Sequence, residues 1–122
     1  MMDSIKYLLS IETRGIKLGL QRTKDMMDVC NNPHLGLPVI QVVGTNGKGS
    51  VCAILASILK MANYKTGLFT SPHLMHLNER IRINGQTIPD IEIDSFIQSY
   101  KKYIEKIEAT FFEITTAMAC WY

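Results

Sequence analysis

The spacing of apolar residues along the chain separates helical segments from extended ones. Ile5, Leu8 and Leu9 recur at helical spacing, which predicts a helix over residues 3–12. A second helix is expected from about Gln21 to Val29, where "NNPHLGLP" breaks it. Asp3 or Ser4 can cap the first helix. After a loop, one stripe at helical spacing predicts a third, amphipathic helix. Its members are Val51, Ile54, Leu55, Ile58, Leu59 and Ala62.

Two short β-type runs flank this third helix. The run Pro38–Val43 is apolar and β-branched except at Gln41, which is typical of a strand buried on both faces in a parallel sheet. The segment "YKTGLFT" offers a second strand after the helix. Strand, helix and strand within roughly 30 residues form a right-handed βαβ unit. We therefore expect an α/β fold: a P-loop-type three-layer domain with a mainly parallel sheet.

The second half of the chain predicts a hairpin and two helices. In "ERIRINGQTI", apolar and basic residues alternate, and Asn84-Gly85 supplies a type I′ turn. A helix follows, and its apolar stripe comprises Ile93, Phe96, Ile97, Tyr100, Ile104 and Ile107. The last segment starts near Thr110 and still reads as a helix at Tyr122.

Composition narrows the class of protein. The 122 residues are 47% hydrophobic and 20% charged, which suits one globular domain with one core. Thirteen basic and eleven acidic residues leave a net charge of +2, so no nucleic-acid partner is expected. Three widely spaced cysteines fit free thiols in a reducing compartment. No secretory signal or 18-residue apolar run is present, so we expect a cytoplasmic protein and no membrane partner.

The stretch "VVGTNGKGS", residues 42–50, lies between the predicted strand and the amphipathic helix. Converging backbone N–H groups, a helix N-terminus, a lysine and a hydroxyl are what a phosphate-binding loop requires. The spacing departs from GxxxxGK[ST], because the first glycine is too near Lys48 and Gly49 stands where a hydroxyl residue normally follows. A plain glycine-rich turn is the alternative, but the flanking elements favour phosphate binding.

The same string resembles the ATP loop of the folylpolyglutamate synthase and dihydrofolate synthase family, relatives of the Mur ligases. Three further segments resemble that family in order: "GIKLGLQR", "TSPHL" followed by "NERIRING", and "ATFFEITTAMA". Glycine after the lysine favours folate ligases over Mur-type peptide ligases, in which threonine is usual. The resemblance implies the Mur ligase central-domain fold.

The resemblance assigns ATP phosphates to the glycine loop, with Lys48 as the catalytic cation. The ATP-binding residues it implies are Thr45, Asn46, Gly47, Lys48, Gly49 and Ser50. It also implies that Ser71 is a Mg²⁺ ligand, although a serine before proline is by itself only a turn residue. His73 and His76 are a weak metal pair, so we expect a structural or supporting role for His73 and a surface role for His76. Glu79 and Arg80 are either a polar pair near the site or a solvated hairpin edge.

A pterin or folate is expected on another set of residues. The family segments point to Ile16, Lys17, Leu18, Thr110, Phe111, Phe112 and Glu113. A flat pterin needs an aromatic wall and a few polar anchors, roles that Phe112 and Thr110 can fill. The alternative is that the two phenylalanines are core residues, and we expect this of one of them.

The reaction implied by the resemblance is ATP-dependent ligation of L-glutamate to dihydropteroate, folate or both, through an acyl phosphate and with Mg²⁺. The family is considerably longer than 122 residues. We therefore expect residues 1–122 to be the N-terminal part of the ATP-binding ligase domain, without the C-terminal glutamate-binding domain. The full-length protein is expected to be a monomer. A Mur-type ligase and a nucleotide-binding fragment without catalysis remain the alternatives.

Overall fold

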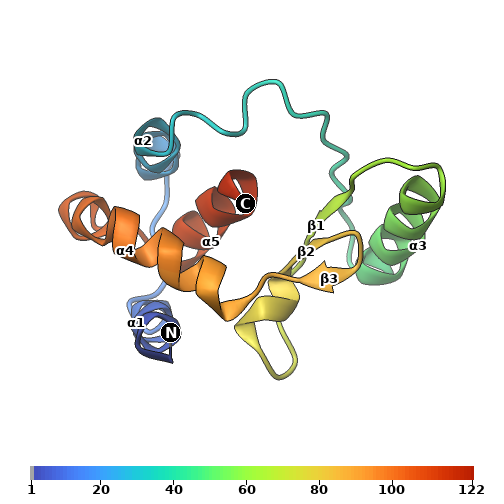
Figure 1. Ribbon diagram of the computed structural model, residues 1–122. Helices are drawn as coiled ribbons and strands as arrows, with labels where there is room; N and C mark the ends of the chain where they lie inside the picture. Colours follow the sequence, from blue (N-terminus) through green and yellow to red (C-terminus); the bar gives the residue numbers. More distant parts are fainter. Residues whose placement is uncertain (1) are drawn as a thin grey trace. The chain divides into compact units, whose positions relative to one another are not determined.

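The computed structural model describes residues 2–122, which divide into two compact units. One unit contains the described residues up to Leu37 together with Pro89–Tyr122, and the other is Pro38–Ile88. Figure 1 labels the elements along the chain. They are α1 (Met2–Glu12), α2 (Gln21–Val29), α3 (Lys48–Met61), β1 (Gly67–Phe69), the 3₁₀ helix η1 (Leu77–Arg80), β2 (Ile81–Ile83), β3 (Gln86–Thr87), α4 (Asp90–Ile107) and α5 (Phe111–Trp121).

The first unit is a cluster of four helices, α1, α2, α4 and α5, which contact one another around a single core. The predicted stripe of α4 provides Ile93, Phe96, Ile97 and Ile104 to this core. Phe96 is completely buried, and its ring lies 4.9 Å from that of Tyr100 and 5.2 Å from that of Trp121, centroid to centroid. Burying a large apolar side chain contributes about 1.5–3 kcal/mol, so these stripes hold the unit together.

The second unit contains α3 and a three-stranded antiparallel sheet of order β1-β2-β3. The predicted strand in "YKTGLFT" and the predicted hairpin are confirmed as β1 and β2–β3. At the hairpin turn Asn84 and Gly85 both have positive φ, 52° and 82°. This is the combination that a type I′ turn requires, and it fixes Ile83 opposite Gln86.

The predicted strand at Pro38–Val43 is wrong for the described residues, and with it the parallel βαβ unit. This segment has no regular structure, and Val39, Ile40 and Val43 are 76%, 65% and 77% exposed. A strand exists only in a ladder with a neighbour. Among residues 2–122, β1 pairs with β2 alone and stands at the edge of the sheet, so the expected parallel pair is not formed.

The helix predicted after the glycine loop is confirmed as α3, but its apolar stripe is not covered. None of the described α3 residues is buried, and Ile54 and Ile58 are 61% and 58% exposed. The helix begins at Lys48, three residues before the stripe does. No helix within residues 2–122 combines the length and the apolar character needed to cross a bilayer.

Candidate functional site

The glycine loop turns into the first turn of α3. Gly47 is the N-cap residue and has a left-handed conformation with φ of 75°, while Gly44 has φ of 150°. Both values favour glycine over any residue with a Cβ. The N–H of Val51 donates to the carbonyl of Gly47 at 3.0 Å, which closes the first helical turn. The first amides of a helix have no partner inside it, so Lys48, Gly49 and Ser50 supply backbone donors at this end.

The segment after β1 contains Ser71, which is exposed and joined to Pro72 by a cis peptide bond. Two residues later, Nδ1 of His73 accepts a hydrogen bond from Nε of Arg80 at 2.7 Å. Arg80 is buried, with 6% of its surface exposed. Because a guanidinium always donates, this contact leaves the proton of a neutral His73 on Nε2. The expected structural role of His73 is therefore matched by a definite contact.

The carboxylate of Glu79 organises the loop before η1. It accepts hydrogen bonds from the backbone N–H groups of Leu74, Met75 and His76 at 2.7, 3.0 and 2.9 Å. These three amide donors, in order of effect Leu74, His76 and Met75, lower the pKa of Glu79 to about 2. The loop therefore keeps its shape although the side chains of Leu74 and Met75 are 92% and 79% exposed.

In the helical unit, Thr110 and Glu113 form a capping box at the start of α5. The N–H of Thr110 donates to Oε1 of Glu113 at 2.9 Å, and the N–H of Glu113 donates to Oγ1 of Thr110 at 3.4 Å. The sequence Thr-x-x-Glu predicts this arrangement. Both residues are 5% exposed, so their polar groups serve first to begin the helix.

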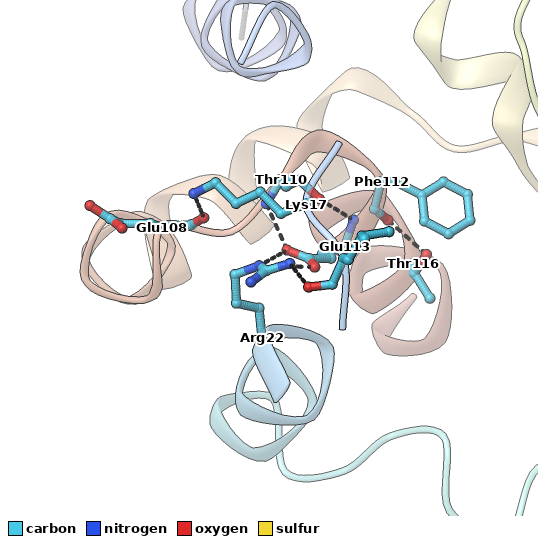
Figure 2. A network of polar contacts seen from close by, with 8 residues as sticks. Lys17, Arg22, Glu108, Thr110, Phe112, Glu113 and Thr116 are labelled. Atoms are coloured by element: carbon cyan, nitrogen blue, oxygen red, sulfur yellow. Dashed lines mark hydrogen bonds and ion pairs between the residues drawn. The ribbon is translucent and has the colours of Figure 1, made fainter. Parts of the chain in front are cut away.

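Arg22, in the first turn of α2, joins this capping box to the loop that precedes α2. Its Nε lies 3.1 Å from both carboxylate oxygens of Glu113, and its Nη2 donates to the carbonyl of Leu18 at 3.0 Å. Nζ of Lys17 donates to the carbonyl of Glu108 at 3.1 Å. Figure 2 shows these contacts converging around the start of α5. The structure thus brings Lys17, Leu18, Thr110 and Glu113 into one network.

The apolar candidates of this unit divide into one core residue and three exposed ones. Phe111 is 6% exposed, which confirms the expectation that one phenylalanine belongs to the core, whereas Phe112 is 58% exposed. Ile16 and Leu18 are each 92% exposed. In Figure 2 the ring of Phe112 points away from the polar network. An exposed ring is what a wall for a flat heteroaromatic ligand requires.

Arg22 was not among the residues that the sequence singled out. Two signals were present: Arg22 belongs to the "GIKLGLQR" segment, and a glutamate in the first turn of an apolar helix needs a cation once it is buried. The predicted residues 44–50 and Ser71 belong to the Pro38–Ile88 unit, and residues 16–18 and 110–113 belong to the helical unit. Each group is therefore a local arrangement of its own.

Comparison with known proteins gives consistent matches, although a scan against models of protein families found none. The chain is 40% identical over 114 residues to a dihydrofolate synthase/folylpolyglutamate synthase of Bacillus subtilis, covering 88% of this chain and 26% of that protein. It superposes on folylpolyglutamate synthetase from Lactobacillus casei with a TM-score of 0.89 and 30% identity, over 99% of this chain and 32% of that one. The chain also superposes on a solved FPGS–AMPPCP–folate complex with a TM-score of 0.85 and 30% identity. This match covers 99% of this chain and 31% of that one.

These likenesses define the fold as that of the folate-ligase structures, here a helical cluster with a small mixed α/β unit. Over nearly its whole length the chain is similar to proteins of the folylpolyglutamate synthase/dihydrofolate synthase family. It spans about a quarter of the length of the Bacillus subtilis relative, 26%. The expected resemblance is confirmed.

Proposed function

We propose that the protein containing this chain is an ATP-dependent ligase that joins L-glutamate to dihydropteroate, to folate or to both. The observation that carries the proposal is the likeness, over 99% of the chain, to a solved complex of FPGS with AMPPCP and folate. The local geometry agrees, because α3 begins at Lys48 directly after Gly47, and both Gly44 and Gly47 in this loop have positive φ. That geometry suits a phosphate-binding helix start.

ATP phosphates are assigned to the loop that leads into α3. The backbone N–H groups of Gly47, Gly49 and Ser50 donate to phosphate oxygens, and the ammonium of Lys48 neutralises charge on the β- and γ-oxygens. Thr45 and Asn46 complete the loop with exposed polar side chains. The support for these roles is the positive φ of Gly44 and Gly47, which lets the backbone turn toward an anion.

The pteridine is assigned to the helical unit. Phe112 offers an exposed ring as a wall, and the loop Ile16–Leu18 offers two exposed apolar side chains. Thr110 and Glu113 supply polar groups at the start of the same helix, although their hydrogen-bonding capacity is partly used within the capping box. We therefore propose a binding surface in which the apolar contacts come from exposed side chains and the anchors come from the start of α5.

Mg²⁺ is assigned to the Ser71 hydroxyl, and its remaining protein ligands would come from the rest of the longer protein. This fits the donor set, because Mg²⁺ accepts hard oxygen ligands and usually takes few of them from the protein. No group of three or more His, Cys, Asp or Glu side chains within residues 2–122 forms a metal cage. When bound, the ion would offset negative charge on the transferring phosphoryl group.

The reaction has two steps. A carboxylate oxygen of the pteroyl substrate attacks the γ-phosphorus of ATP, the bond to the bridging oxygen breaks, and ADP leaves. The amine of glutamate then attacks the acyl phosphate carbon, phosphate leaves with the bonding electrons, and the amine loses a proton as the amide forms. Lys48 stabilises the phosphoryl charge in the first step, and the binding surfaces hold the reactants in line.

We also propose that residues 1–122 form the N-terminal part of the ATP-binding domain of a longer, monomeric, cytoplasmic enzyme. Further strands would give Pro38–Val43 a parallel neighbour and would cover the apolar stripe of α3. The exposure of Val39, Ile40 and Ile54 supports this, since contiguous exposed apolar side chains usually mark a surface that something covers. The glutamate-binding domain would lie in the remaining chain.

A substrate matrix tests the proposed function. The complete protein would be incubated with Mg-ATP, L-glutamate and either dihydropteroate, folate or a UDP-linked peptide precursor, and products would be weighed by mass spectrometry. We expect ADP, phosphate and a glutamyl amide only with the pteridine substrates. Turnover of the UDP-linked substrate alone would favour a Mur-type ligase, and nucleotide binding without any turnover would contradict the ligase assignment.

A further inference from the structure

One guanidinium in the helical unit connects a solvent-exposed loop to a buried carboxylate. Arg22 contacts both oxygens of Glu113 at 3.1 Å through Nε and the carbonyl of Leu18 at 3.0 Å through Nη2. The Glu113 side chain is only 6% exposed and that of Arg22 is 22% exposed. A half-desolvated, two-point contact of this kind is strong and directional. Arg22 therefore fixes the position of the loop before α2 relative to the start of α5.

The loop is held by polar contacts on its backbone side, while its apolar side chains face water. Lys17 provides the second tie, from its Nζ to the carbonyl of Glu108 at 3.1 Å. Ile16 and Leu18, on either side of Lys17, are each 92% exposed. Exposed apolar side chains contribute no burial energy to this conformation. The polar ties therefore carry the ordering of the loop.

We propose that Arg22 is a positioning residue for the pteridine substrate, an inference that rests on the proposed function. It acts through the loop Ile16–Leu18, whose apolar side chains it presents in a fixed arrangement before the ligand arrives. A loop ordered in advance loses less conformational entropy on binding. Loss of Arg22 should therefore weaken pteridine binding far more than nucleotide binding, because the nucleotide loop belongs to the other unit.

The competing explanation is that the ion pair only fastens α2 to α5, which contact each other. Arg22→Lys separates the two explanations. A lysine keeps the charge and can pair with Glu113, but its single ammonium cannot also span to the Leu18 carbonyl in the fork geometry of arginine. Helix attachment is then largely kept, whereas the tie to the loop is lost.

The matched control is Arg14→Lys in the same unit. Arg14 also pairs with a glutamate, Glu105, but at 3.9 Å and with both side chains nearly half exposed, 46% and 48%. Exposed pairs of this type contribute little. Arg14→Lys thus makes the same arginine-to-lysine change at a position where the side chain does not connect a buried carboxylate to a loop carbonyl.

Steady-state kinetics of the complete enzyme would be measured for wild type, Arg22→Lys, Arg22→Gln and Arg14→Lys. For Arg22→Lys we expect KM for the pteridine to rise about tenfold, the loss of roughly one charge-assisted hydrogen bond. KM for ATP should stay within about twofold, and Tm within about 2 °C. Arg22→Gln should show a larger rise, and Arg14→Lys should behave as wild type.

An unchanged pteridine KM in both Arg22 variants would overturn the proposal, as would equal rises in the KM for pteridine and for ATP. Amide hydrogen exchange of residues 16–20 in the same proteins gives a readout independent of turnover. We expect exchange about tenfold faster in Arg22→Lys than in wild type or Arg14→Lys, and equal rates would overturn the proposal. Absence of glutamate-dependent turnover in the wild type would instead count against the proposed function.

Discussion

The helical unit buries the apolar stripes of its helices, whereas the Pro38–Ile88 unit leaves the apolar stripe of its helix exposed. In the helical unit the stripes of α4 and α5 are buried, and Phe96 and Ile114 are among the completely enclosed side chains. In the other unit α3 carries an equally regular stripe, but none of its residues is buried. An amphipathic pattern thus predicts a helix reliably, while burial depends on a neighbour that the pattern does not supply.

Each of the two units also contains a glutamate, near the start of a helix, whose carboxylate accepts hydrogen bonds from backbone N–H donors. The buried carboxylate of Glu113 accepts from the backbone N–H of Thr110 and from Arg22, whereas that of Glu79 accepts from three backbone N–H groups of an exposed loop. A buried, charge-paired carboxylate is sensitive to the loss of its partner. An exposed one is sensitive mainly to its own protonation. The comparison therefore predicts different responses to mutation and to pH.

The largest expected effect is on turnover, and it follows from replacing Lys48 in the Pro38–Ile88 unit. Lys48→Ala in the complete enzyme should lower kcat by on the order of 1,000-fold, because a cation directed at transferring phosphoryl charge is removed. Stability should hardly change, since Lys48 is exposed. The control is Lys60→Ala, near the other end of the same helix. Near-normal turnover by Lys48→Ala would contradict the assignment of the loop.

The second-largest effect is expected on stability, and it distinguishes the buried stripe of α4 from the exposed stripe of α3. Phe96→Ala should cost about 3–5 kcal/mol of unfolding free energy, because it leaves a cavity beside Tyr100 and Trp121. Ile54→Ala in α3 should change it by less than about 0.5 kcal/mol, since that side chain is 61% exposed. Urea unfolding of the 122-residue chain measures both. Comparable losses would show that α3 is covered after all.

A smaller effect is expected at the hairpin turn. Gly85 has φ of 82°, and a residue with a Cβ in the left-handed region costs roughly 1–2 kcal/mol. Gly85→Ala should therefore destabilise the Pro38–Ile88 unit by about that amount, whereas Asn84→Gly should be nearly neutral. Hydrogen exchange of the β2 and β3 amides reports on the unit directly. Equal protection in both variants would exclude the type I′ turn as a determinant of register.

The smallest effect is local and depends on pH. The pKa of Glu79 is lowered to about 2 from an ordinary value of 4.5, so the ionised form favours the ordered loop. This contribution is fully present above pH 4.5 and is lost as the pH falls toward 2. Amide exchange of Leu74, Met75 and His76 should accelerate over that range. In Glu79→Gln it should be fast throughout, and a pH-independent wild-type profile would refute the contact.

Local sequence signals predicted most of the elements but not all of their surroundings. The Thr-x-x-Glu box and the Asn84-Gly85 turn are local, so their residues were predictable from spacing alone. Pro38–Val43 was predicted as a strand because its residues favour one, yet a strand needs a paired neighbour. The tie between Arg22 and Glu113 joins residues 91 positions apart, a separation that no periodicity encodes.

We propose that phosphate and pteridine recognition reside in separate parts of this chain. Calorimetric titration of the complete enzyme with AMPPCP and with folate, for wild type, Lys48→Ala and Phe112→Ala, tests it most directly. We predict that Lys48→Ala weakens AMPPCP binding at least about tenfold and leaves folate binding within about twofold, and that Phe112→Ala does the reverse. If either variant weakened the binding of AMPPCP and folate equally, or if neither variant weakened the binding of any ligand, recognition would not be divided in this way.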